Sequence, residues 1–263
     1  MDEVKTAILL VGCGRMGGAM ARGWAPHETV YAYDPQAEAI PGTTRLDRLA
    51  ADGLPMPLTL VVAVKPQMLG SVLPELIPFA RAGCLILSIV AGATLRGFRD
   101  ALGPEARIIR TMPNTPAAIG RGVTAAIAGP GVTYADRQRA DALLKALGQT
   151  LWLEDEAQMD AVTAVSGSGP AYFFRFTEAL ARAGESCGLD PATAMALARA
   201  TFTGAAALAE SRDDPLDALR IEVTSPGGTT AAALAEFESE EGLDRLVRLA
   251  AEAAARRSRE LSS

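Results

Sequence analysis

Short apolar runs alternate with amphipathic stretches through the first 153 residues. The apolar runs are typical of strands buried on both faces, and the stretches between them are typical of helices. The runs predict strands at Thr6–Gly12, Thr29–Asp34, Leu58–Val64, Cys84–Val90 and Gln149–Leu153, and less clearly at Arg107–Pro113 and Gly122–Gly129. Strands separated by helices predict βαβ units and a parallel sheet covered on both faces.

From Glu154 onward the apolar runs stop and long Ala/Leu/Arg patterns take over. These patterns predict helices at 157–165, 169–186, 191–211, 215–223, 229–239 and 243–260. Asp190 and Asp214 each precede a proline, as N-caps do, and Gly188 suits a helix C-terminus. The sequence therefore predicts an α/β Rossmann-type domain at 1–153, followed by an all-α dimerisation domain at 154–263.

The helical half has apolar and small residues around much of each helix, as in 171–184 and 192–209. Helices of this kind pack on all sides, but about 110 residues form few wholly buried helices of their own. We therefore expect a homodimer with interleaved helices. No apolar run approaches the roughly 18 residues of a membrane span, and the run Ala7–Val11 does not suit a signal peptide.

The amino-acid composition indicates which classes of partner and which cellular compartment to expect. Hydrophobic residues make up 49% of the chain and charged residues 21%, with a net charge of -6, which is typical of a globular protein without nucleic-acid or membrane partners. The three cysteines (Cys13, Cys84 and Cys187) are widely spaced, so neither a disulfide framework nor a metal site is expected. A reducing cytoplasm is the expected compartment.

A G-x-G-x-x-G pattern at Gly12, Gly14 and Gly17 follows the first predicted strand and opens a helix. In a dinucleotide-binding turn, these glycines permit the tight turn, the approach to the pyrophosphate and close helix–strand packing. The alternative is a purely structural turn. Asp34, at the end of the next strand, can accept a hydrogen bond from a ribose 2′-hydroxyl, which favours NAD over NADP, or it can be a turn residue before Pro35.

Two further loops follow predicted strands and are expected to overlook the same crevice. In Ala63–Gln67, Lys65 can touch ribose or phosphate, or it is a solvated lysine at a strand end. In Met112–Pro116, Asn114 and Thr115 can shape a nicotinamide pocket, or Asn114 forms a simple Asx turn. Nearby Arg15 and Arg45 leave binding of an adenosine phosphate open.

Two hydroxyl-rich loops punctuate the helical half. Ala164–Tyr172 reads as a loop in which Ser168 or Gly169 caps the next helix. Val223–Thr230 carries four hydroxyls around a Pro-Gly-Gly turn, and the next helix starts at Thr229. Hydroxyls and helix amides together form a small anion site that suits a carboxylate. The alternative is a doubly capped helix–helix turn.

The residues missing from the helical half limit its chemistry. The single histidine is His27, and no lysine follows Lys145. Reduction of a ketone by hydride needs an acid for the oxyanion, usually His or Lys, whereas an iminium nitrogen already carries its proton. Orientation then supplies most of the acceleration. The composition favours reduction of an imine over reduction of a ketone.

Five motifs, in this order, resemble those of pyrroline-5-carboxylate reductases across essentially the whole chain: Gly12–Gly17, Ala63–Gln67, Met112–Pro116, Ala164–Tyr172 and Val223–Thr230. The last two are the most specific. The resemblance implies NAD(P)H-dependent reduction of Δ1-pyrroline-5-carboxylate to L-proline in proline biosynthesis. It also implies a Rossmann domain and a helical domain that forms a dimer, with dimers often assembling into rings.

The resemblance also implies residue roles. The amides of Gly227, Gly228 and Thr229 bind the substrate carboxylate, with Ser225 nearby. Thr230 is the catalytic residue, with its hydroxyl near the ring nitrogen, and Glu156 lies near the substrate. The implied cofactor-lining residues are Gly12, Cys13, Gly14, Arg15, Met16, Gly17, Ala63, Val64, Lys65, Pro66, Ile89, Val90 and Ala91.

Several readings stay open beside this one. Between Asp34 and Leu58 the chain is short and departs from the family pattern, which leaves the choice between NAD and NADP open. β-Hydroxyacid dehydrogenases share the expected architecture but use a lysine in the helical domain, which this chain lacks. A reductase of another cyclic imine and a non-catalytic NAD-binding regulator are the remaining alternatives.

Overall fold

The computed structural model describes residues 7–262, which form two compact units. The first unit comprises 7–168 together with 254–262, and the second comprises 169–253. The chain thus passes from the first unit to the second between Ser168 and Gly169. A domain border at 153/154 stays a prediction. The first predicted strand begins at Ile8, and Thr6 lies outside the described residues.

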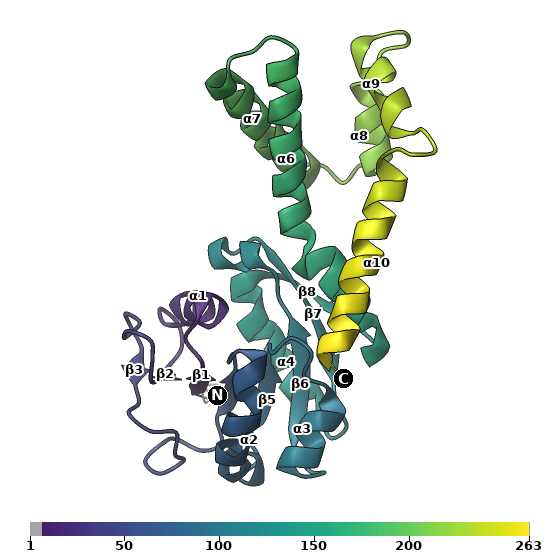
Figure 1. The fold of residues 1–263 in the computed structure, drawn as a ribbon. Coiled ribbons are helices and arrows are strands. Elements are labelled where there is room, and N and C mark those ends of the chain that lie inside the picture. The colour runs from purple at the N-terminus through teal and green to yellow at the C-terminus, as the bar shows by residue number, and fades with distance from the viewer. Residues whose placement is uncertain (1–6, 263) are drawn as a thin grey trace. The chain divides into compact units, whose positions relative to one another are not determined.

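Within the described residues, an eight-stranded sheet forms the frame of the first unit (Figure 1). The strand order is β3-β2-β1-β4-β5-β6-β7-β8, so the winding direction reverses between β1 and β4. In such sheets, ligands bind at this reversal, beyond the carboxyl ends of the strands. The strands are β1 (Ile8–Val11), β2 (Val30–Tyr33), β3 (Thr44–Arg45), β4 (Thr59–Val62), β5 (Leu85–Ser88), β6 (Arg107–Met112), β7 (Gly122–Ala128) and β8 (Gly148–Trp152).

One strand pair corrects the expectation of a wholly parallel sheet. β6 and β7 are antiparallel, with Ile109 opposite Ala128, whereas the other pairs are parallel. The connection between them consists of residues 113–121 and contains the short helix η1 (Thr115–Ile119). A parallel crossover needs about a dozen residues or more, so a connection this short forces the chain to reverse.

The two-residue strand β3 was not predicted from the sequence. It pairs with β2 at the edge of the sheet, with Arg45 opposite Ala32. Both of its residues are exposed, so no apolar pattern marks it. β3 therefore depends on pairing with β2, and it brings Arg45 next to the end of that strand.

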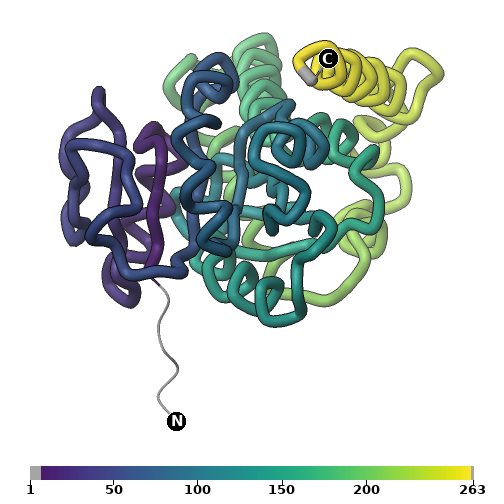
Figure 2. The backbone as a smooth tube through the Cα atoms, turned by 90° about the horizontal axis from the view of Figure 1, so that it is seen from below, coloured from purple at the N-terminus to yellow at the C-terminus, as the bar shows by residue number. Residues whose placement is uncertain are grey.

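Helices cover both faces of the sheet and bury two separate apolar clusters (Figure 2). Because side chains alternate along a strand, Leu9 points into one cluster, and Ile8 and Leu10 point into the other. Phe79 and Phe98 lie in the first cluster, and Trp24 lies in the second, where its indole donates to the carbonyl of Leu143 at 2.8 Å. The helices are α1 (Arg15–Trp24), α2 (Pro66–Arg81), α3 (Leu95–Leu102), α4 (Tyr134–Leu144) and η2 (Lys145–Leu147).

The second half of the chain is helical, as predicted. The helix predicted at 169–186 matches the observed one, and the ends of the four that follow differ by at most two residues. The helical elements are η3 (Glu156–Gln158), α5 (Met159–Val162), η4 (Thr163–Gly167), α6 (Gly169–Ser186), α7 (Pro191–Glu210), α8 (Leu216–Glu222), α9 (Thr229–Phe237) and α10 (Leu243–Ser262).

The two Asp-Pro pairs behave differently. Asp190 caps α7 as predicted, because its carboxylate accepts hydrogen bonds from the amides of Ala192 and Thr193. The predicted cap at Asp214 is wrong. Pro215 itself holds the N-cap position of α8, so Asp214 lies one residue too early and accepts from Arg212 Nε at 2.8 Å instead. Gly188 follows α6 with φ of 101°, as expected after a helix end.

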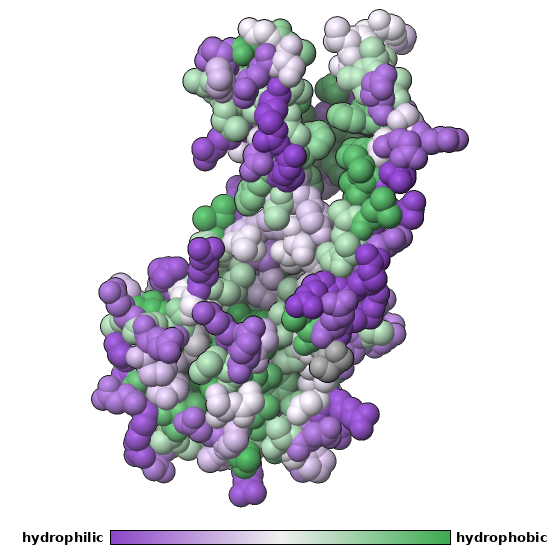
Figure 3. Space-filling model, viewed as in Figure 1, coloured by the Kyte–Doolittle hydropathy of each residue, from purple (hydrophilic) through white to green (hydrophobic). Residues whose placement is uncertain are grey.

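The second unit has little apolar core of its own. Among its described residues, the buried apolar side chains are those of Ala181, Ala194 and Ala198. Its large apolar side chains lie at the surface, and Figure 3 shows such a group over the first turns of α10. Those more than half exposed are Phe173, Phe174, Leu197, Leu216, Ile221, Val223, Leu246 and Val247. A unit so poor in buried area needs another apolar surface to cover it.

Candidate active site

Four parallel strands end at a common edge of the sheet. Tyr33, Val11, Val62 and Ser88 lie in register across β2, β1, β4 and β5. The next residue of each strand therefore lies on this edge, and these residues are Asp34, Gly12, Ala63 and Ile89. All four were predicted from the sequence to line a cofactor. The structure brings them together at the point where the sheet changes its winding direction.

The three glycines of the first loop meet three different steric demands. Gly12 has φ of 98°, and a Cβ there would lie 2.6 Å from the carbonyl oxygen of Ala63. A Cβ on Gly17 would lie 2.1 Å from the carbonyl oxygen of Gly12, where helix and strand pack closely. A Cβ on Gly14 would meet nothing within 4 Å. The backbone at Gly14 therefore faces open space, which is the condition for a close approach by a pyrophosphate.

Helix α1 presents its N-terminus at this loop. Gly14 is its N-cap, no side chain of the described residues caps it, and its first turn has no acidic residue. The first amides of a helix carry partial positive charge and lack intrahelical acceptors. Arg15 is exposed beside them, and Met16 is partly buried against the core. This end of α1 can accordingly hold a dinucleotide pyrophosphate.

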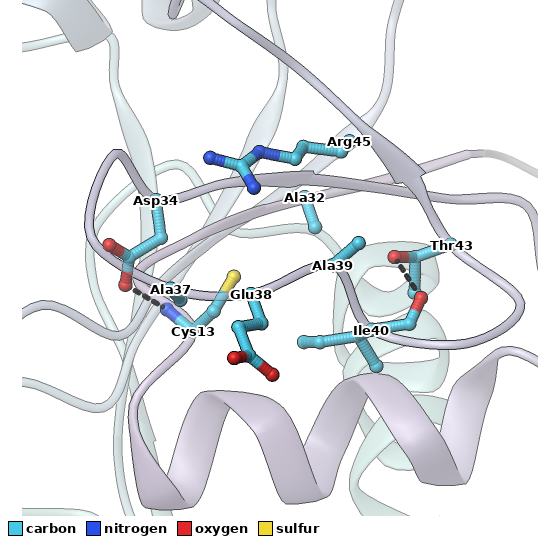
Figure 4. Close-up of a pocket in the computed structure, with 9 residues that line it drawn as sticks. All are labelled: Cys13, Ala32, Asp34, Ala37, Glu38, Ala39, Ile40, Thr43 and Arg45. Atoms are coloured by element: carbon cyan, nitrogen blue, oxygen red, sulfur yellow. Dashed lines mark hydrogen bonds between the residues drawn. The ribbon is translucent and has the colours of Figure 1, made fainter.

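Asp34 holds the glycine loop as well as facing the pocket. Its Oδ2 accepts from the amide of Cys13 at 2.7 Å, and its Oδ1 accepts from the amide of Gln36 at 2.9 Å (Figure 4). Partial burial, and then the charge of Asp34, raise the pKa of the Cys13 thiol to about 11. Cys13 is thus a neutral thiol at physiological pH, and Asp34 is both a turn residue and a pocket residue.

A small pocket adjoins Asp34 at the ends of β2 and β3. Figure 4 shows the Arg45 guanidinium on the side of Asp34. The Glu38 carboxylate points away from this guanidinium. Both Glu38 and Arg45 are exposed. The lining residues are Cys13, Ala32, Asp34, Ala37, Glu38, Ala39, Ile40, Thr43 and Arg45. Glu38 was not predicted as a site residue, because a single acidic residue in a polar loop does not by itself indicate a binding role.

The other residues predicted to line the cofactor follow β4 and β5, and they differ in exposure. Lys65 is exposed and is the N-cap of α2, and Pro66 is the first residue of that helix. Val64 packs on one core cluster and Ile89 on the other, while the Val90 side chain is buried, so Val90 offers backbone atoms alone. Ala91 is partly exposed.

Asn114 follows β6 at the same edge. Its Oδ1 accepts from the amide of Val123 at 3.0 Å, which ties the loop after β6 to β7. Asn114 therefore does not form the Asx turn that was one alternative from the sequence, because its side-chain oxygen bonds to a residue nine positions away. The side-chain NH2 group of Asn114 has no partner among residues 7–262. It can still face a ligand.

The Val223–Thr230 loop lies in the second unit and contains a tight turn. The amide of Gly228 donates to the carbonyl of Ser225 at 3.0 Å, and Gly227 has φ of 68°. Pro226 and Gly227 hold the two central positions, as proline and a positive-φ glycine do in type II turns. Gly228 then serves as the N-cap of α9, which begins at Thr229 as predicted.

The hydroxyls of this loop divide into two kinds. Thr224 donates to the carbonyl of Arg220 at 2.6 Å, and so it satisfies the end of α8. The hydroxyls of Ser225, Thr229 and Thr230 have no hydrogen-bond partner among the described residues. No side chain in that part of the chain caps α9 either. The loop therefore presents unpaired hydroxyls and unpaired helix amides at the same turn.

The predicted loop at Ala164–Tyr172 is wrong. Residues Thr163–Gly167 form the π-helix η4, and Ser168, its C-cap, has helical dihedrals, so a single residue separates η4 from α6. Ser168 accordingly does not cap α6. A Cβ on Gly167 would lie 2.9 Å from the Met112 side chain, so this glycine permits close packing against β6. π-Helical turns are rare and often occur at functional sites.

Glu156 has two partners in the first unit. Its Oε1 accepts from Arg110 Nη1 at 2.7 Å and from the amide of Leu95 at 2.8 Å. Arg110 is a buried side chain of β6 that the sequence reading did not single out. Arg110 could have been noticed in the sequence, because it lies within the apolar run of β6 and a buried charged residue usually has an oppositely charged partner. No cluster of His, Cys, Asp or Glu suited to a metal ion occurs among the described residues, and none of their helices is long and apolar enough to span a membrane.

The sheet order, the glycine turn and the open end of α1 define the class of the first unit: it is a Rossmann-type dinucleotide-binding oxidoreductase unit. Residues 156–261 match the family model for pyrroline-5-carboxylate reductase dimerisation. The pyrroline-5-carboxylate reductase of Pseudomonas aeruginosa is 41% identical, covering 97% of this chain and 96% of its own length. The chain belongs to the pyrroline-5-carboxylate reductase family.

Solved structures agree with this assignment. The pyrroline-5-carboxylate reductase of Coxiella burnetii is 31% identical with a TM-score of 0.91, covering 98% of this chain and 99% of the other. The Plasmodium falciparum enzyme with NADP bound is 29% identical with a TM-score of 0.83 and covers 98% of each chain. A reductive aminase from Aspergillus terreus in complex with NADPH, 22% identical with a TM-score of 0.57, shares the fold.

Proposed function

We propose that this chain reduces the C=N bond of Δ1-pyrroline-5-carboxylate to give L-proline in proline biosynthesis. The observation that carries the proposal is the start of α9, where amides and the hydroxyls of Ser225, Thr229 and Thr230, none of them paired within residues 7–262, meet at one turn. Membership of the reductase family supports it. The carboxylate of this substrate matches the amides, and its ring nitrogen matches a hydroxyl.

The chain's residues would bind and orient the substrate in this way. The amides of Gly227 and Thr229, with the Ser225 hydroxyl, hold the carboxylate in place of a cation, whereas the Gly228 amide is used within the turn by its bond to the Ser225 carbonyl. The Thr230 hydroxyl accepts from the protonated ring nitrogen and fixes which face of the imine is open. After reduction the same hydroxyl can donate to the amine. No general acid is required, because the iminium nitrogen already carries its proton.

The first unit would hold the cofactor. The open backbone at Gly14 and the uncapped amides of α1 would hold the pyrophosphate, beside the edge residues after β4 and β5. A reduced nicotinamide dinucleotide supplies the hydride when it is bound. Lys65 and Arg15, both exposed at this edge, would contact its phosphates. Asn114 would place its free NH2 group toward the nicotinamide.

NADH oxidation with pyrroline-5-carboxylate tests the reaction, with piperideine carboxylate and a keto acid run beside it. We expect turnover with the five-membered imine and none with the keto acid. A preference for the six-membered imine would support the other-imine alternative. NADH binding without any turnover would instead identify a regulator.

We infer that the small pocket beside Asp34 takes the adenosine ribose, and that the charges around it give a preference for NADH. Asp34 and Glu38 bring two negative charges and Arg45 one positive charge to its lining. A ribose 2′-hydroxyl can donate to Asp34, whereas a 2′-phosphate would meet a net negative site. Because the Arg45 guanidinium can bind a phosphate group, we expect the enzyme to use NADPH as well, but less efficiently than NADH.

Two charge changes at exposed positions test this preference without disturbing the glycine loop. Glu38→Gln should raise kcat/KM for NADPH about three- to tenfold relative to NADH, and Arg45→Gln should lower it by a similar factor. Arg48→Gln is the matched control, because Arg48 is exposed, pairs with Asp52 and is absent from the pocket lining. Wild-type preference for NADPH would contradict the inference.

The apolar surface of the second unit supports self-association through this unit. We propose a homodimer that covers these side chains, with larger rings of dimers built from it. Mass photometry at nanomolar to micromolar concentrations distinguishes monomer, dimer and ring. We place the protein in the cytoplasm, where its three free cysteines stay reduced.

A further inference from the structure

A buried arginine lies in the middle of the sheet. Arg110 of β6 is 7% exposed, and its neighbours in register are Ser88 of β5 and Ile127 of β7. A buried guanidinium needs a negative partner, and breaking such a pair strongly destabilises a fold. The partner is Glu156, at 2.7 Å. This ion pair joins η3 to the carboxyl-terminal half of β6.

The same carboxylate oxygen also caps a helix. Glu156 Oε1 accepts from the amide of Leu95, the first residue of α3, from 61 positions away. The local cap Thr94 takes the amide of Gly97 instead. A carboxylate at a helix N-terminus is favourable because it meets the positive end of the helix dipole. Glu156 therefore holds the first residue of α3 from outside the helix, beside the local cap at Thr94.

The segment between β5 and α3 is held at both of its ends. At the first end, the amide of Ile89 donates to the Val62 carbonyl at 3.0 Å. A turn follows, in which the amide of Ala93 donates to the Val90 carbonyl at 3.3 Å and Gly92 has φ of 78°. The second end is the cap by Glu156. The turn between these anchors includes Ala91, on the edge assigned to the cofactor.

We propose that Glu156 is a positioning residue for the dinucleotide: it holds the start of α3, and through it the Val90–Ala93 turn, at the cofactor edge. The inference rests on the proposed function only in assigning this edge to the cofactor. Direct contact with the substrate is not part of this role, because Arg110 balances the Glu156 charge and one of its oxygens already has two donors.

Three variants test the role, with the NADH dissociation constant and the KM for pyrroline-5-carboxylate measured separately. Glu156→Ala removes both contacts, and we expect NADH binding to weaken about five- to tenfold. Glu156→Gln keeps an oxygen for Leu95, so its NADH affinity should stay within about threefold of the wild type. Asp155→Asn is the control, because Asp155 is exposed and caps η3 through Ala157.

The double variant Glu156→Ala/Arg110→Met serves if the single variant does not fold, because it leaves no buried charge without a partner. It still lacks the cap on Leu95, so NADH binding should stay weakened. Full recovery of NADH affinity in the double variant would overturn the proposal. Unchanged NADH affinity in Glu156→Ala with a raised KM for the imine would also overturn it, in favour of substrate contact. A wild-type chain that binds NADH but does not reduce the imine contradicts the proposed function alone, since the NADH measurements still apply.

Discussion

Two glycine-containing turns precede the two helix starts assigned to ligands, and they differ in what surrounds the glycines. The turn before α1 follows a buried strand, and Gly12 and Gly17 leave no room for a Cβ beside backbone atoms. The turn before α9 joins two helices, and a Cβ on Gly227 would meet nothing within 4 Å. Both helices start without a side-chain cap among the described residues.

The difference indicates two ways to bind an anion. In the first turn, steric packing holds the amides in place, and the loop offers backbone donors to a pyrophosphate. In the second, the backbone is held by the Ser225–Gly228 turn and by the Thr224 hydrogen bond, and three hydroxyls without a partner in the described part of the chain lie beside the amides. Hydroxyls can both donate and accept, so they suit a ligand that carries a carboxylate and an N–H group.

The largest effect is expected where packing is tightest. Gly17→Ala places a Cβ 2.1 Å from the Gly12 carbonyl oxygen, and backbone must move to accept it. Overpacking of this kind costs about 1–3 kcal/mol of stability, and because the backbone shift displaces the amides assigned to the pyrophosphate, NADH should bind at least about tenfold more weakly. Gly70→Ala in α2 is the control, because its Cβ would meet nothing within 4 Å. Calorimetric NADH affinity within threefold of the wild type in Gly17→Ala would remove the distinction between the two turns.

The second effect concerns the hydroxyl assigned to the ring nitrogen. Thr230→Ala should lower kcat with pyrroline-5-carboxylate by roughly ten- to a hundredfold, while the NADH dissociation constant stays unchanged. Thr230→Ser keeps the hydroxyl and should retain most of the turnover. Steady-state kinetics measures both variants. Equal kcat in Thr230→Ala and wild type would show that orientation by the amides is sufficient.

A smaller effect is expected at the hydroxyl beside the carboxylate. Ser225→Ala should raise the KM for pyrroline-5-carboxylate about three- to tenfold, since one neutral hydrogen bond is lost. Its kcat should change little, because the contact is the same before and during hydride transfer. A fall in kcat with constant KM would place Ser225 at the reacting atoms instead.

The smallest kinetic effect is expected at the hydroxyl that already has a partner. Thr224→Val removes the hydrogen bond to the Arg220 carbonyl and should lower the free energy of unfolding by about 0.5–1 kcal/mol. Both kcat and KM should stay within twofold of the wild type. Thermal unfolding and steady-state kinetics on the same preparation separate the two quantities. Kinetic changes as large as those of Ser225→Ala would mean that the loop's hydroxyls act as one group.

Some features were predictable because their signals are local. The cap at Asp190 and the start of α9 at Thr229 follow from residue types next to each other. Errors occurred where a neighbour in sequence or space decided the outcome. Asp214 failed as a cap because Pro215 took that position, and the Gly-Ser-Gly stretch joins the end of η4 to the start of α6 through the single residue Ser168 instead of forming a loop.

The sequence by itself determined the two kinds of region, the seven predicted strands and the family, because periodicity and short motifs are carried by neighbouring residues. The tertiary structure decided the reversal of β7, the pairing of Arg45 beside Ala32 and the contact of Glu156 with Arg110 and Leu95. Each of these depends on which segments the fold brings together. The short connection after β6 reverses β7, the edge of β2 accepts β3, and the buried Arg110 binds Glu156. Each of these outcomes requires strands that are already in place.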